Sequence, residues 1–312
     1  MAENSLEGRI ALVTGASRGL GKGIAIELAA AGATVYVTAR RLEDNSSGLG
    51  ALEASRAEIA AMGGRCIAVA CDQGVDREIR ALVDRIGAEQ GRLEILVNNA
   101  YPGVNLGSGW QPFWEAPPEN WDAMVGVGLR SHYIASAYAM PLLIEAGGLV
   151  VNISSGGSYA YLGSVPYAVG KAGMDALARF MAVELAATGV TPVSLWPGFV
   201  RTELMMAGWK ESPEALAAAL KLATAHFDFD PWALSGARTG LAVTETPRFT
   251  GRAVVALARD ERVKMKAGKT LAVVRLADEY GFTDIDGTSP DAFHFRRSSQ
   301  WPALTGDAAK SD

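Results

Sequence analysis

The sequence has few cysteines and no long hydrophobic run. Among its 312 residues are only two cysteines, Cys66 and Cys71, which lie an odd number of residues apart in one apolar segment. In a strand they therefore point to opposite faces, so we expect neither a disulfide nor a metal site. No apolar run reaches the roughly 18 residues that a membrane span needs, and residues 1–8 are polar. We therefore expect a cytoplasmic protein with no membrane span and no secretory signal.

The sequence also has no excess of positive charge. It contains 29 Lys and Arg against 34 Asp and Glu, a net charge of −5, and no block of like charges. A nucleic-acid partner is therefore not expected. Hydrophobic residues at 49% and charged residues at 20% are typical of a soluble globular protein.

Short apolar runs alternate with amphipathic segments along most of the chain. The predicted strands are residues 10–14, 34–38, 66–71, 93–97, 149–153, 191–196 and 270–274. The predicted helices include residues 49–62, 75–89, 119–145, 164–187 and 249–259. Strands that are apolar on both faces and separated by helices predict an α/β fold, a Rossmann-type doubly wound parallel sheet of about seven strands.

We expect a single domain over residues 6–276, in which residues 203–248 cover the substrate. Residues 277–312 form a C-terminal extension, polar from residue 278 onward and expected to be irregular.

A glycine-rich turn follows the first predicted strand, with glycines at positions 15, 19 and 21. Gly15 allows a tight exit from the strand, Gly19 lets the backbone approach a pyrophosphate, and Gly21 permits close packing of the next helix. The spacing G-x-x-x-G-x-G differs from G-x-G-x-x-G, and taken alone it also fits an ordinary turn between a strand and a helix.

Tyr167 and Lys171 lie four residues apart in a predicted helix, so their side chains project from the same face. A lysine beside a tyrosine favours the phenolate, and we expect it to lower the pKa of Tyr167 from about 10 toward neutrality. Taken alone, the pair also fits a solvated helix surface.

Five motifs in order resemble the short-chain dehydrogenase/reductase family. They are T-G-A-S-R-G-L-G at 14–21, N-N-A at 98–100, Ser155, Y-x-x-x-K at 167–171 and P-G at 197–198. Residues 127–133 and 280–287 further resemble one subgroup of that family. The resemblance implies hydride transfer between a nicotinamide and a carbonyl or alcohol carbon, with Ser155, Tyr167 and Lys171 as the catalytic residues. Tyr167 would be the acid/base and Ser155 would orient the substrate oxygen, with Ser154 as the alternative.

The charges after the second strand favour NADP(H) over NAD(H). Ala39 stands where NAD-preferring members of the family usually have Asp, and Arg18 and Arg40 could both bind a 2′-phosphate. In the alternative reading, Arg40 and Arg41 open a solvated loop. The resemblance implies cofactor contacts by Gly15, Ser17, Arg18, Gly19, Leu20, Gly21, Arg40, Asp72, Gln73, Asn99, Tyr167, Lys171, Pro197, Gly198, Val200 and Thr202.

Two positions depart from the family pattern. Gly128 stands where the family commonly has an asparagine that supports a water-linked proton relay to the lysine, and Tyr101 stands where glycine is usual. Gly128 offers no side-chain amide for such a relay, and Tyr101 would narrow or line the pocket near the nicotinamide.

Apolar and aromatic residues gather in three loops that follow predicted strands, which suggests an apolar substrate pocket. They are Trp110, Phe113, Trp114, Tyr159, Tyr161, Phe199, Met205, Met206, Trp209, Phe227, Phe229 and Trp232. Packing of the cover or contact between subunits explains them equally well.

Three functions fit these observations. The first is an NADP(H)-dependent carbonyl reductase or alcohol dehydrogenase, and the second is a 3-oxoacyl thioester reductase with the same catalytic residues. The third is a sensor or scaffold that binds NADP(H) without catalysis. The resemblance also implies a homodimer or homotetramer, paired through helices near residues 119–145 and 164–187.

Overall fold

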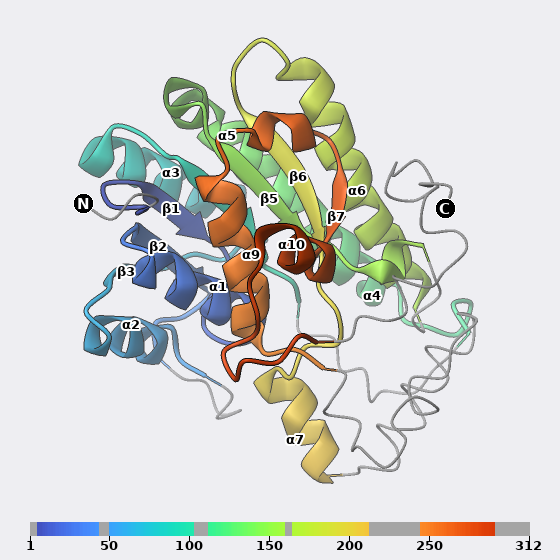
Figure 1. Cartoon of the computed structure of the whole chain (residues 1–312). Helices are drawn as coiled ribbons and strands as arrows, with labels where there is room; N and C mark the ends of the chain where they lie inside the picture. The colour runs from blue at the N-terminus through green and yellow to red at the C-terminus, as the bar shows by residue number, and fades with distance from the viewer. Residues whose placement is uncertain (1–4, 44–49, 103–111, 160–163, 212–243, 291–312) are drawn as a thin grey trace, which may run out of the picture.

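The computed structural model describes residues 5–43, 50–102, 112–159, 164–211 and 244–290 (Figure 1). Seven parallel strands form one sheet in the order β3-β2-β1-β4-β5-β6-β7, which confirms the predicted doubly wound fold. The strands are β1 (Ile10–Val13), β2 (Thr34–Ala39), β3 (Arg65–Ala70), β4 (Ile95–Asn98), β5 (Leu149–Ile153), β6 (Thr191–Trp196) and β7 (Thr270–Ala272).

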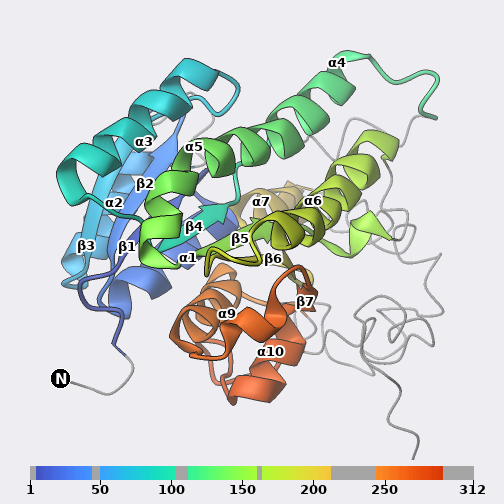
Figure 2. The same ribbon diagram turned by 90° about the horizontal axis from the view of Figure 1, so that it is seen from above.

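Helices cover both faces of this sheet (Figure 2). The α-helices are α1 (Gly19–Ala30), α2 (Leu52–Ala61), α3 (Asp76–Gln90), α4 (Glu119–Trp121), α5 (Ser131–Ala146), α6 (Val165–Glu184), α7 (Glu203–Glu211), α9 (Pro247–Arg259) and α10 (Val273–Tyr280). Shorter or wider helical segments are η1 (Asp122–Arg130), η2 (Gly156–Ser158) and η5 (Val263–Lys266). Within the described ranges, no helix is both long and apolar enough to cross a membrane.

The alternation of side chains along each strand divides the core into two layers. In β1, Ala11 and Val13 face the layer formed with α1 and α9, whereas Ile10 and Leu12 face the layer formed with α3 and α5. All four are buried, because a parallel sheet covered on both sides has no solvated face.

The helix predicted over residues 119–145 has a different form in the structure. It runs as α4, η1 and α5, and η1 is a π-helix of nine residues. The backbone stays helical through both junctions, so the change is one of helix width rather than an interruption. Such widened turns are rare and occur mostly at functional sites.

The last predicted strand, residues 270–274, was too long. It ends at Ala272, and Val273 and Val274 begin helix α10, where both are buried. Burial against α9 and the sheet outweighs the preference of valine for strands. The prediction of an irregular chain from residue 278 was also wrong at its start, because α10 continues to Tyr280.

Candidate active site

The predicted site residues follow the ends of four adjacent strands. The glycine turn comes after β1, Asn99 after β4, Ser155 after β5 and Gly198 after β6. Because all strands are parallel, these segments share the carboxyl edge of the sheet, which is where doubly wound folds bind ligands.

The structure brings Ser155 and Tyr167 together at this edge. The Ser155 Oγ lies 2.8 Å from the Tyr167 hydroxyl and accepts a hydrogen bond from the Gly157 N–H at 3.1 Å. Ser154 points elsewhere, since its Oγ donates to the Lys171 carbonyl at 3.0 Å. Ser155, and not Ser154, therefore stands beside the predicted acid/base.

Lys171 is one turn further along α6 and is only 6% exposed. Its Nζ donates to the Ile153 carbonyl at 2.9 Å, at the end of β5. Burial lowers the pKa of Lys171 to about 7, partly opposed by the negative charge of Asp175.

The expected lowering of the pKa of Tyr167 is not found in the structure. Burial raises the pKa of Tyr167 above its ordinary value, and the hydrogen bond with Ser155 only partly offsets this rise. The Lys171 Nζ lies 5.7 Å from the centroid of the Tyr167 ring, and burial weakens its positive charge by lowering its own pKa. The effect of desolvation on the pKa of Tyr167 is therefore larger than the effect of the nearby lysine charge that the spacing suggested.

The glycine turn is held by Asn99 and by close backbone packing. The Asn99 Nδ2 donates to the Thr14 and Gly15 carbonyls at 2.8 and 3.0 Å. Gly15 adopts a left-handed conformation with φ of 68°, and a Cβ at Gly21 would lie 2.4 Å from the Asn99 Nδ2. No side chain fits at Gly21, so the close packing predicted there is confirmed, and Asn99 braces the turn.

A carboxylate lies where the turn is expected to bind a phosphate. The Gly19 N–H, at the first residue of α1, donates to Glu203 Oε2 at 2.7 Å. Free N–H groups at a helix N-terminus attract anions, and here the carboxylate stands in for one. The site therefore fits the pyrophosphate of a dinucleotide, which would be held by the backbone of the glycine turn.

The side chains expected to bind the adenosine part of the cofactor lie in the glycine turn and just after β2 and β3. Arg18 is half-buried and Arg40 is exposed directly after β2, which ends at Ala39. Ala16 N–H donates to the Thr38 carbonyl at 2.8 Å, so the glycine turn and the end of β2 are adjacent. Arg18 and Arg40 therefore follow two neighbouring strands, β1 and β2.

The remaining residues of this half contact other parts of the protein. Asp72 Oδ1 accepts from the Gly74 N–H at 2.8 Å, and the buried Gln73 donates through Nε2 to the Cys71 Sγ at 3.2 Å. The Ser17 carbonyl accepts from the Ser55 Oγ at 3.3 Å, and Leu20 packs against the core.

The loop after β6 is held by a buried carboxylate that sequence reasoning missed. Glu245 Oε2 accepts from the Gly198 N–H at 3.1 Å, and its Oε1 accepts from the Thr250 hydroxyl at 3.0 Å. Glu245 also forms a parallel bridge with Val200. Burial raises the pKa of Glu245 to about 7. No local pattern marks Glu245, because its partner Gly198 is 47 residues away.

Two acidic residues that follow α10 support the same loop. Asp284 accepts hydrogen bonds from the Thr246 N–H at 2.7 Å and from the Thr246 hydroxyl at 2.5 Å. Arg201 pairs with Asp286 at 3.4 Å. Val200 and Thr202, both expected to hold the nicotinamide, lie in the segment that these contacts fix.

Only part of the predicted apolar pocket can be placed. Phe113, Trp114 and Tyr159 are exposed, and the Phe113 and Trp114 rings meet edge to face at 5.3 Å. Phe199, Met205 and Met206 are half-buried, and Trp209 lies in α7. Trp110, Tyr161, Phe227, Phe229 and Trp232 lie outside the described residues.

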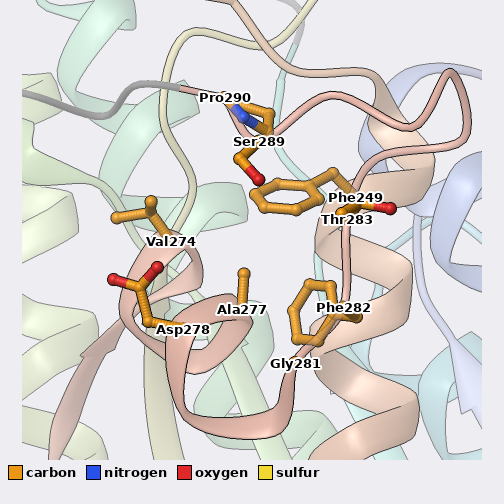
Figure 3. Close-up of a pocket in the computed structure, with 9 residues that line it drawn as sticks. All are labelled: Phe249, Val274, Ala277, Asp278, Gly281, Phe282, Thr283, Ser289 and Pro290. Atoms are coloured by element: carbon orange, nitrogen blue, oxygen red, sulfur yellow. The ribbon is translucent and has the colours of Figure 1, made fainter.

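A separate cavity of about 270 Å³ lies between α9, α10 and the chain that follows (Figure 3). Its lining residues are Phe249, Val274, Ala277, Asp278, Gly281, Phe282, Thr283, Ser289 and Pro290. None of them is a predicted catalytic or cofactor residue.

A nucleotide-type doubly wound sheet with serine, tyrosine and lysine grouped at its carboxyl edge defines a dinucleotide-dependent oxidoreductase. Comparison with known proteins agrees, since residues 9–213 match the family model described as short chain dehydrogenase. The chain belongs to the short-chain dehydrogenase/reductase family, whose members use NAD(P)(H) and act on CH–OH or C=O groups.

Similar proteins fall in the same family. Dehydrogenase/reductase SDR family member 1 of Homo sapiens is 43% identical over 286 residues, covering 90% of this chain and 85% of that protein. This confirms the subgroup resemblance drawn from residues 127–133 and 280–287. The 3-oxoacyl-(acyl-carrier-protein) reductase of a Synechocystis strain is 32% identical over 202 residues, 64% of this chain and 77% of that protein. A short-chain type dehydrogenase/reductase from Mycobacterium marinum superposes with a TM-score of 0.67 at 26% identity, covering 86% of this chain and 95% of that one.

Proposed function

We propose that the protein transfers a hydride between NADP(H) and a carbonyl or secondary alcohol of an apolar substrate. The observation that carries this proposal is the contact of 2.8 Å between the Ser155 Oγ and the Tyr167 hydroxyl, with Lys171 one turn away. The bound nicotinamide supplies or accepts the hydride. The protein has to polarise the substrate oxygen and move one proton.

In the reductive direction, the Tyr167 hydroxyl donates its proton to the carbonyl oxygen while Ser155 donates a hydrogen bond to the same oxygen. In the oxidative direction, the phenolate form of Tyr167 takes the proton from the alcohol. Burial raises the pKa of Tyr167, so its hydroxyl is protonated at neutral pH, as an acid must be. Protonated Lys171 favours the phenolate that remains after the proton is given up.

Replacing Tyr167 tests this assignment. Tyr167→Phe should lower kcat at least about a hundredfold, because only the transferable proton is lost. Its affinity for NADPH, measured by fluorescence titration, should change little. Tyr138→Phe is the matched control, since Tyr138 lies on α5 with its ring against Arg80. An active Tyr167→Phe enzyme would overturn the role of Tyr167.

The preference for NADP(H) rests on Arg18, Arg40 and the missing acidic residue at Ala39. Arg40→Ala should weaken NADPH binding about tenfold or more and leave NADH binding nearly unchanged, since a hydrogen bond between charged groups contributes about 1.5–3 kcal/mol. Arg41, the exposed neighbour, provides the control variant Arg41→Ala. Equal losses for both cofactors would refute a contact between Arg40 and the 2′-phosphate.

The class of substrate is open to a direct screen. The relative from Synechocystis acts, by its name, on 3-oxoacyl groups carried by a protein, so a 3-oxoacyl thioester reductase is the second candidate. We expect rates with NADPH to rise with the apolar surface of a ketone series and to exceed those with 3-oxoacyl thioesters. Rates that do not depend on hydrophobicity would remove the apolar pocket from the proposal.

A homo-oligomer is also part of the proposal. Large apolar side chains are exposed along α6 at Val165, Val169, Phe180 and Val183, and α5 adds Tyr133. Their helical spacing forms one stripe on α6, and such a stripe favours pairing with a second copy. Light scattering of the wild type and of Phe180→Glu distinguishes a dimer or tetramer from a monomer.

A further inference from the structure

Tyr101 fills the space that Gly128 leaves open beside the catalytic lysine. A Cβ at Gly128 would lie 2.5 Å from the Tyr101 Cε2 and 2.9 Å from its Cδ2. Contacts this short do not occur, so no other residue fits at position 128 while the ring stays in place. The two departures from the family pattern, Gly128 and Tyr101, therefore depend on each other: the glycine leaves the space that the ring fills.

The Lys171 ammonium lies over the ring of Tyr101. Its Nζ is 4.4 Å from the centroid of that ring, compared with 5.7 Å for the ring of Tyr167. The rings of Tyr101 and Tyr167 meet edge to face at 5.8 Å. An ammonium within about 6 Å of an aromatic face is attracted by it, most strongly when both are buried.

Lys171 has few other partners for its three N–H donors. Its Nζ donates to the Ile153 carbonyl at 2.9 Å and approaches the Met174 Sδ, a weak acceptor, at 3.8 Å. The ring of Tyr101 therefore provides an electron-rich surface for the Lys171 ammonium on a side where no strong hydrogen-bond acceptor contacts it.

The titratable side chains near Lys171 belong to several segments that pack against it. Asp175, on the same helix, attracts the ammonium but accepts hydrogen bonds from the Ser194 Oγ and the Trp196 Nε1. His132, on α5, is neutral at physiological pH because burial lowers its pKa to about 3. Tyr101 is also neutral, since burial raises its pKa. Because the Tyr101 hydroxyl is uncharged, Tyr101 attracts the Lys171 ammonium through the face of its ring alone.

We propose that Tyr101 is a positioning residue that holds the protonated amine of Lys171 against its ring, and that Gly128 is required to admit that ring. This inference rests on the proposed function, in which Lys171 acts beside Tyr167. Without the ring, the amine stays buried but loses an attractive surface, so its protonated form becomes less stable.

Substitutions at two positions test the arrangement. Tyr101→Leu keeps the site apolar but removes the ring, and it should lower the pKa of Lys171 by about one pH unit. Tyr101→Phe keeps the ring and should leave this pKa unchanged. Gly128→Ala should displace the ring and lower the pKa as Tyr101→Leu does. Gly126→Ala, on the same π-helix, is the control, because a Cβ at Gly126 meets nothing within 4 Å.

The primary measurement is a ¹³C NMR titration of the lysine Cε in the cofactor-free protein, with the signal assigned by Lys171→Met. In the active enzyme, the alkaline limb of kcat for reduction should move to lower pH by the same amount. An unchanged pKa in Tyr101→Leu and Gly128→Ala would overturn the inference. So would an equal shift in Tyr101→Phe, which would assign the effect to the hydroxyl.

The two proposals fail in different ways. Should wild type reduce no carbonyl compound while the NMR shifts appear as expected, the proposed function fails and the positioning role stands. If Tyr101→Leu does not fold, Gly128→Ala carries the same expectation, because it keeps the tyrosine in the chain and displaces only its ring from Lys171.

Discussion

Glu245 holds the loop after β6, and its contribution to the free energy of unfolding depends on pH. Its folded pKa is about 7 against an ordinary value of 4.5, because the side chain is buried. Between these values the folded protein keeps a proton that the unfolded chain has lost. The contribution of Glu245 to stability is therefore complete below pH 4.5 and is lost as the pH rises through 7.

Glu245→Gln removes this dependence and keeps the contacts. The amide oxygen can accept from the Gly198 N–H, and the amide nitrogen can donate to the Thr250 hydroxyl, which is also an acceptor. The difference between 4.5 and about 7 at about 1.4 kcal/mol per pH unit gives about 3.5 kcal/mol. We expect the variant to be more stable than wild type by up to this amount at pH 8 and to match it at pH 4.5.

Urea unfolding between pH 4.5 and 8 measures this difference directly. Glu261→Gln, a change at an exposed residue near the end of α9, is the control and should leave the profile unchanged. Parallel profiles for wild type and Glu245→Gln would refute the reasoning, because they would mean that Glu245 ionises alike in both states.

Two further predictions concern cofactor binding at the glycine turn and the loss of stability at low pH. Glu203→Ala should tighten NADPH binding about fivefold in a fluorescence titration, because the carboxylate no longer holds the Gly19 N–H or repels phosphate; unchanged or weaker binding would contradict this. His132 has its pKa lowered from 6.5 to about 3 by burial, so wild type should lose stability as the pH falls from 6.5 toward 3. His132→Gln, which can still donate to the Ala100 carbonyl, should lose less over that range in urea unfolding, and an equally steep loss would exclude His132 as the cause.

Local patterns along the chain were enough to predict the architecture. Alternating apolar strands and helices predicted the seven-stranded parallel sheet, because burial on both faces leaves a recognisable composition in each strand. The left-handed conformation of Gly15, with φ of 68°, is a local requirement, so glycine at that position could be predicted from the turn alone. Alternation of side chains at the end of the strand favoured Ser155 over Ser154, and Ser155 is the one that lies 2.8 Å from the Tyr167 hydroxyl.

Other features depend on neighbours that are distant in the sequence. Residues 270–274 have strand propensity, yet Val273 and Val274 are helical and buried, and Val273 packs in one cluster with residues of α9. The π-helix over Asp122–Arg130 places Gly128 against Tyr101, and neither residue alone predicts the other. Glu203 and Glu245 reach the cofactor loops across 184 and 47 residues.

The sequence by itself determined the fold, the family and the three residues proposed to carry out the reaction. Only the tertiary structure decided the protonation of that site. A lysine four residues from a tyrosine suggested a lowered pKa for Tyr167, but burial raises it and lowers the pKa of Lys171 to about 7. The physical reason is that spacing determines which charges are neighbours, whereas desolvation depends on everything that the fold packs around them.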